Sequence, residues 1–378
     1  MAIRHCIELG YHRSTDKFHR NLDTLAKEMI KRCFWVAYDL DRTAAFTLGR
    51  PLGIPEECID VELPANVDDE YITASGYSCH LAQSSSETPT TITGAIHVIR
   101  LRKLWVRFDQ ELYSKRGLDS STRATRLNTL RHDLDQWRLS TPDPYPTANY
   151  QPLSVFVSAE WFQLAYDHSI LLLYRPYMIS GADAGRENTA FFIGEGRQDI
   201  DESLAIERAY EECSVRSREI CLLYRKLHRE YGVQFTWGSL HILFLASLTY
   251  LYCLSKSPRV QQLTRQGEVS STCMACSTVL SVMAERWRAA APFLDLFEKL
   301  AEATINKLFA NGYFRPAEKT PVKTSSLDLS QVHVSDESEI LIQSLWQEQD
   351  EIQFSTAADF DAGGIFASLT TDVADSPR

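Results

Sequence analysis

A helical pattern of apolar residues near the start of the chain constrains the fold most strongly. Between residues 30 and 48, apolar side chains recur with the spacing of one helix face: Ile30, Cys33, Phe34, Ala37, Leu40, Ala44 and Leu48. Gly49 and Pro51 then predict the end of this helix, because glycine accepts a left-handed backbone and proline cannot continue the hydrogen-bond ladder. Asp41 falls on or beside the predicted apolar face, where a carboxylate needs a hydrogen-bond or ion-pair partner.

The same periodicity fills most of the following 260 or so residues. It predicts helices over 92–116, 121–139, 155–174, 200–230, 235–255, 270–288 and 291–309. We expect the helix over 155–174 to stop at Arg175 and Pro176, and residues 180–197 to form a loop. No run of alternating strands and no fixed repeat is present. The pattern therefore predicts an all-α, multi-helix fold, with the apolar run over 240–254 as a core helix too short to favour a membrane span.

The last part of the chain has a different composition. From Pro316 to Arg378, twelve acidic residues stand against three basic ones, so most of the net charge of −11 lies there. Ser, Thr and Gln are frequent, which predicts disorder over 313–378. Apolar residues set among these acids are typical of activation segments, which bind a groove of a partner protein. The main candidates are Leu345, Trp346, Phe354, Phe360 and Phe366.

The sequence offers no basis for catalysis or metal binding. Cys273 and Cys276 form a CxxC pair without a second pair, and their helical context favours core packing over a metal or redox site. His5, Cys6 and His12 lack the same-face spacing of a ligand set. Gly-x-Ser-x-Gly and phosphate-loop patterns are absent, and the acidic balance argues against a free-standing nucleic-acid binder. We expect no catalytic residue and no cofactor in this chain.

Two acids near the start of the chain carry structural hypotheses. We expect Asp41 to accept hydrogen bonds from Arg42, Arg50 or the backbone of the turn at Gly49, and so to lock the helix to the segment after it. The alternative is a solvent-facing acid. Glu28 and Arg32 have the spacing of a solvated helix pair. The large aromatic side chains favour a core, although some could instead line a cavity for a small effector.

The order of motifs around this helix resembles the fungal-specific transcription factor domain, also called the middle homology region. The resemblance covers roughly residues 1–310 and is sharpest over the first 64. Its main residues are Arg32, Trp35, Tyr38, Asp41, Arg42, Gly49, Arg50 and Pro51, with later echoes at Tyr174, Arg175 and Pro176. It implies a regulatory domain over 1–312, followed by the acidic tail over 313–378.

In that family a six-cysteine zinc cluster and a dimerising coiled coil precede the domain, and neither lies in this sequence. The resemblance therefore implies a nuclear transcription regulator, incomplete at its N-terminus, that reaches DNA only through partners or a missing module. Zinc is expected only in that module. The tail is expected to recruit the transcription machinery. Two other readings stay open: a helical small-molecule binder or enzyme unrelated to transcription, and a non-functional truncated product with an exposed apolar face.

Overall fold

Helices make up nearly all of the regular structure in the computed structural model, which describes residues 2–78, 89–113, 120–143, 158–187, 198–231 and 236–310. The all-α prediction is confirmed for this part of the chain. One short antiparallel hairpin, β1 (Ile72–Thr73) and β2 (Gly76–Tyr77), was not expected, because strands of two residues are too short to show alternation. The predicted tail over 313–378 lies outside the described residues.

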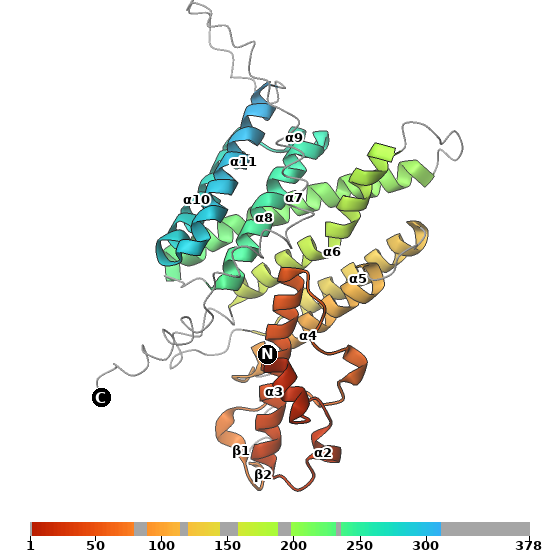
Figure 1. Cartoon of the computed structure of the whole chain (residues 1–378), viewed down its shortest axis with the longest axis vertical. Helices are drawn as coiled ribbons and strands as arrows, with labels where there is room; N and C mark the ends of the chain where they lie inside the picture. Colours follow the sequence, from red (N-terminus) through yellow and green to blue (C-terminus); the bar gives the residue numbers. More distant parts are fainter. Residues whose placement is uncertain are drawn as a thin grey trace, which may run out of the picture.

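The first part of the chain forms a small unit around one long helix (Figure 1). Its elements are α1 (Ala2–Glu8), α2 (Thr15–Phe18), α3 (Thr24–Leu48), the 3₁₀ turns η1 (Glu56–Cys58) and η2 (Asp69–Tyr71), and the hairpin. A separate core cluster holds this unit together: Ile3, Cys6, Phe34, Trp35, Ala37, Tyr38, Ile54, Val61 and Ile99. Helix α3 therefore packs in this cluster together with Ile99 of a later helix, while Phe46 near its C-terminal end packs against the larger core described below.

Helix α3 begins and ends at local sequence signals. The Asp23 side chain accepts a hydrogen bond from the Ala26 amide at 2.7 Å, which caps the N-terminus. Gly49 follows Leu48 with a φ of 59°, the left-handed conformation that glycine favours. The predicted stop is confirmed. The predicted buried face was partly wrong, because Cys33 and Leu40 are exposed, whereas the buried side is built around Trp35 and Tyr38.

The remaining helices form a bundle around one large core (Figure 1). They are α4 (Thr93–Phe108) with a π-helical turn η4 (Asp109–Tyr113), α5 (Ser120–Leu139), α6 (Ala159–Glu187), α7 (Gln198–Tyr231), α8 (Trp237–Lys256), α9 (Pro258–Leu263), α10 (Gln266–Arg286), η6 (Arg288–Ala290) and α11 (Ala291–Ala310). One continuous hydrophobic cluster extends from Leu101 in α4 to Ala301 in α11. The core thus spans almost the whole described bundle.

Helix α8 lies at the centre of this core. Every residue from Leu240 to Leu254 except Ile242 is buried, and the helix contacts α7, α11, α10, α6 and α3. Among the described residues it is the one helix long and apolar enough to cross a membrane, yet 83% of its apolar window is buried inside the protein. Its apolar surface is therefore used in packing, and the predicted core helix is confirmed.

One predicted helix end was wrong. Helix α6 continues through Pro176 to Glu187, so Arg175 and Pro176 do not stop it, and part of the predicted loop over 180–197 is helical. A proline inside a helix costs about 3 kcal/mol, and the extensive packing of α6 against α7 offsets that cost. The predicted helix over 92–116 is α-helical from Thr93 to Phe108 and continues as the π-helical turn η4, and its predicted end at residue 116 lies outside the described residues.

Candidate functional site

A fully buried arginine lies at the centre of the polar contacts of α3. The guanidinium of Arg42 donates to Asp41 Oδ2 at 2.6 Å, to the carbonyl oxygen of Ile54 at 2.9 Å and to Glu56 Oε2 at 3.3 Å. It also lies over the ring of Tyr38, 4.1 Å from the centroid, and the Tyr38 hydroxyl donates to Glu56 at 3.0 Å. This set of contacts, here called the Arg42 anchor, joins α3 to the segment that follows it.

Asp41 completes the Arg42 anchor from the same turn of α3. Its Oδ2 also accepts a hydrogen bond from the Gly53 amide at 3.1 Å. The hypothesis that Asp41 locks the helix to its exit segment is thus confirmed for Arg42 and for a backbone group, but that group belongs to Gly53 and not to the turn at Gly49. A Cβ atom at Gly53 would collide with the Asp41 carboxylate and lie 2.6 Å from Ile3 Cγ2. Glycine is required there for this close approach.

Two further carboxylates, those of Glu62 and Glu28, hold the segment that follows α3 in place. The Trp35 indole donates to the carbonyl oxygen of Glu62 at 2.9 Å, and the Glu62 carboxylate accepts hydrogen bonds from Ser14 Oγ and from the amide and hydroxyl of Thr15. Burial works to raise the pKa of Glu62, but these hydrogen bonds outweigh it and lower the pKa to about 2. Glu62 is therefore held as a carboxylate.

Glu28 is buried, which corrects the predicted solvated pair with Arg32. Its carboxylate accepts from Lys31 Nζ at 2.8 Å, from the Ala65 amide at 3.0 Å and from the Tyr77 hydroxyl at 2.8 Å. Arg32 instead donates to Asp69 at 2.6 Å. Spacing along the helix could not show this, because the partners of Glu28 and Arg32 come mostly from distant parts of the chain.

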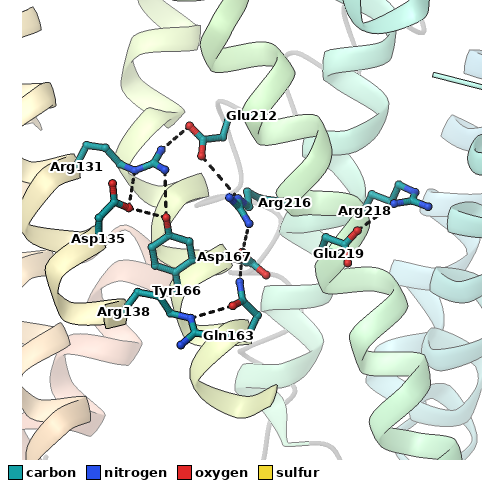
Figure 2. Close-up of polar contacts among 10 residues, drawn as sticks. All are labelled: Arg131, Asp135, Arg138, Gln163, Tyr166, Asp167, Glu212, Arg216, Arg218 and Glu219. Carbon is teal, nitrogen blue, oxygen red and sulfur yellow. Dashed lines mark hydrogen bonds and ion pairs between the residues drawn. The ribbon is translucent and has the colours of Figure 1, made fainter. Parts of the chain in front are cut away.

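A second polar network joins α5, α6 and α7 (Figure 2). Arg131 of α5 donates to Asp135 at 2.9 Å, to the Tyr166 hydroxyl at 3.1 Å and to Glu212 of α7. Tyr166 in turn donates to Asp135 at 2.6 Å. Tyr174, one of the motif residues, accepts from Arg131 at 3.3 Å. Of the motif residues, Tyr38, Asp41 and Arg42 thus belong to the Arg42 anchor, and Tyr174 belongs to this network.

The network continues along α6 to Asp167, whose side chain is fully buried (Figure 2). Asp167 Oδ1 accepts from Gln163 at 2.9 Å and from Arg216 at 3.3 Å, while Arg138 donates to Gln163 at 2.9 Å. Burial raises the pKa of Asp167 to about 6, although Gln163 and Arg216 work to lower it. The other carboxylate oxygen has no hydrogen-bond partner. The sequence pattern did not indicate that Asp167 would be a buried, networked carboxylate.

The thiols and imidazoles of the core lack reactive surroundings. Burial raises the pKa of Cys273 to about 12 and that of Cys276 well above its usual value, the opposite of a reactive thiol. Cys276 lies in the core with Cys273 packed against it, so core packing of the CxxC pair is confirmed. Burial also lowers the pKa of His97 to about 4, and its ring stacks on Trp137 at 4.3 Å. Among the described residues no group of three His, Cys, Asp or Glu side chains could hold a metal ion.

One hollow of about 350 Å³ lies beside the C-terminal part of α7. The described residues that line it are Leu222, Arg225, Lys226, Arg229 and Glu230. Pockets for small ligands are lined mainly by apolar and aromatic side chains, whereas this hollow is mostly charged. This hollow therefore gives no support to an effector site, and both polar networks of the described residues serve to hold elements together.

The first 139 residues match the family model described as the fungal specific transcription factor domain. This match includes the Arg42 anchor and the helices α1 to α5. Over this range the chain is similar to fungal-specific transcription factor domains. The matched range contains the motif residues from Arg32 to Pro51, whereas Tyr174, Arg175 and Pro176 lie beyond it.

Several curated relatives are fungal regulatory proteins. The positive regulator of purine utilization of Emericella nidulans is 25% identical over 345 residues, which cover 82% of this chain and 31% of that protein. Pyrimidine pathway regulatory protein 1 of Saccharomyces cerevisiae is 25% identical over 66% of this chain and 25% of its own length. The transcriptional activator protein acu-15 of Neurospora crassa is 25% identical over 57% of this chain and 22% of its own length. The chain thus spans about a third or less of these relatives, and no solved structure matches it.

Proposed function

We propose that this chain regulates transcription in the nucleus, and that its helical part is the regulatory domain. The match of residues 1–139 to the fungal transcription factor domain carries this proposal. The relatives support it, since two are named as regulatory proteins of purine utilization and of the pyrimidine pathway and one as a transcriptional activator. The geometry agrees, because the described polar clusters fasten helices and contain no activated nucleophile, so a role other than catalysis fits them best.

The regulatory unit is proposed to extend to about residue 312, beyond the family match. Its support is the large core, which includes residues of α4 and α5 within the match and residues of α6 to α11 after it. A boundary at residue 139 would cut through this core and expose the faces of α4 and α5 that pack against α6.

The acidic tail is proposed to contact the transcription machinery through its apolar residues, and DNA is proposed to be reached through a separate zinc-cluster module or a partner protein. The acidic composition and the spaced apolar side chains at Leu345, Trp346, Phe354, Phe360 and Phe366 support the first part. No zinc or other cofactor is proposed for this chain.

A tethering experiment tests the proposal. The full chain and, separately, residues 316–378 are fused to an unrelated DNA-binding domain in a fungal reporter strain. We expect both fusions to change reporter transcription, and the tail fusion to activate it. A matched variant with these five candidate residues, Leu345, Trp346, Phe354, Phe360 and Phe366, replaced by alanine keeps the charge and should lose activation. Stable full-chain expression without any change in transcription contradicts the proposed function, whereas failure of the tail fusion alone contradicts only the role of the tail.

A further inference from the structure

Helix α3 has a second apolar face, on the side away from the Arg42 anchor. Five side chains form it at three- and four-residue spacing: Leu25, Met29, Cys33, Val36 and Leu40. All are exposed, with 43% of Leu25, 51% of Met29, 62% of Val36 and 58% of Leu40 open to solvent. We call this set the α3 stripe. At 1.5 Å per residue it is about 22 Å long.

Single exposed apolar residues are common on protein surfaces, but an aligned row is not. The α3 stripe follows the alternating spacing by which two helices pack along a seam. On a helical wheel its members fall within about 80° of one another, and no charged residue of α3 lies between them. The packing inside the domain does not use this face, because the core of α3 lies on the opposite side at Phe34, Trp35 and Tyr38.

Two opposite charges border one edge of the α3 stripe. Arg32 and Asp39 lie seven residues apart. Seven residues are close to two helical turns, so both side chains lie on the same side of α3. Each already has a partner within the chain, Asp69 for Arg32 and Arg102 for Asp39, and each keeps part of its side chain exposed, 21% and 34% respectively. A covering helix therefore meets a positive and a negative group along the same edge.

We propose that the α3 stripe is the surface by which two copies of this chain associate, as an antiparallel pair of α3 helices. A two-fold axis between the two helices, level with residues 34 and 35, would place Cys33 opposite Val36 of the other copy and Met29 opposite its Leu40. The same axis brings Arg32 of each copy near Asp39 of the other, so that two pairs of opposite charges meet along one edge of the seam. A parallel pair would not bring these charges together.

The size of the surface predicts a reversible dimer. One helix face of this length is small compared with the standard protein–protein interface of about 1,600 Å². We therefore expect monomers and dimers to be in equilibrium at protein concentrations of about 10 µM. The inference concerns the domain itself and does not depend on the proposed role in transcription.

Sedimentation velocity of the full chain over this concentration range tests the proposal. We expect the mass to rise from that of one chain, 43.0 kDa, toward twice that value. The double variant Val36→Asp, Leu40→Asp should remain monomeric, with an unchanged helical circular dichroism spectrum, because four buried carboxylates would oppose pairing. The matched control is Val215→Asp, a change at a residue of α7 that is 53% exposed, which should leave the dimer intact.

Cys33 provides an independent readout at the centre of the α3 stripe. A short bismaleimide should link two chains through Cys33, and the variant Cys33→Ser should lose this link although the exposed Cys58 remains. A full chain that stays monomeric at every concentration overturns the proposal and indicates that another segment or protein covers the stripe. A dimer that persists in the double variant overturns it as well, because association then uses another surface.

Discussion

Arg42 is the residue on which the contacts of α3 converge. Its guanidinium has no exposed surface, yet it carries a charge that Asp41 and Glu56 compensate. The Ile54 carbonyl and the Tyr38 ring occupy two further sides of the group. A buried charge of this kind is stable only with all its partners in place, so the cluster behaves as a unit.

Replacing Arg42 by alanine should therefore be severe. We expect the variant Arg42→Ala to lower the free energy of unfolding by about 3–5 kcal/mol, because it leaves Asp41 and Glu56 without their shared cation and opens a cavity. Urea unfolding followed by circular dichroism measures this loss. Arg4→Ala, at an exposed position of α1, is the control and should stay within about 0.5 kcal/mol of the parent. A loss below about 1 kcal/mol for Arg42→Ala would contradict the anchor.

Asp41 should contribute less than Arg42, since it is partly exposed. Asp41→Ala removes the acceptor for Arg42 and for the Gly53 amide, and we expect a loss of about 1–3 kcal/mol. A combined Asp41→Ala, Arg42→Ala variant should lose less than the sum of the two single variants, because the two residues share one interaction. Strict additivity in the same urea titration would show that they act independently.

Asp167 and Glu62 should give the domain opposite responses to pH. The folded-state pKa of Asp167 is raised to about 6, so the folded protein binds the proton more tightly, and stability falls as the pH rises from about 4 to 6. Asp167→Asn removes this response, worth at most about 3 kcal/mol. The parent should therefore gain stability relative to this variant between pH 7 and pH 5.

Glu62 supplies the matched comparison for this pH experiment. Its folded-state pKa is lowered to about 2, so its contribution is complete above the ordinary pKa of glutamate and is lost as the pH falls toward 2. Between pH 7 and pH 5 the difference between the parent and Glu62→Gln should stay constant. A constant difference for Asp167→Asn over the same window would show that its raised pKa does not affect stability.

At the scale of the elements, glycine and proline act according to their surroundings. Gly49 ends α3 by taking a left-handed conformation, whereas Pro176 does not end α6, a helix that packs extensively against α7. Gly53 has a third role, since its missing side chain lets the exit segment approach the Asp41 carboxylate. The same residue types that mark helix ends can thus mark close packing instead.

Two alanine substitutions separate these roles. Gly53→Ala should destabilise the domain by about 1–3 kcal/mol, because its Cβ would displace Asp41 or Ile3. Gly267→Ala should raise stability by up to about 1 kcal/mol, since Gly267 lies within α10 with open space where its Cβ would be. Thermal unfolding of both variants measures the contrast. Equal shifts would show that local space does not decide the effect.

At the scale of the whole molecule, one core joins α4 and α5 to α6 through α11. The network around Arg131 crosses the same boundary, because it links α5 to α6 and α7 (Figure 2). The part that matches the family model and the part that follows it are therefore expected to unfold together.

A truncation tests this cooperativity. Residues 1–312 contain all the described helices, and we expect their thermal midpoint to lie within about 2 °C of that of the full chain, with one transition. Residues 1–139 alone should lack a cooperative transition, because α4 and α5 lose the faces they bury against α6. Cooperative unfolding of the 1–139 fragment would contradict a single unit.

The sequence by itself determined the helical class, the stop of α3 at Gly49 and the resemblance to a transcription factor family. The first two follow from local signals, namely the spacing of apolar residues and a helix-ending glycine. Only the tertiary structure decided which face of α3 is buried, why Pro176 does not end α6, and which partners Glu28, Arg42 and Asp167 have. Those outcomes depend on residues far away in the chain, and a local pattern contains no information on which distant groups folding brings together.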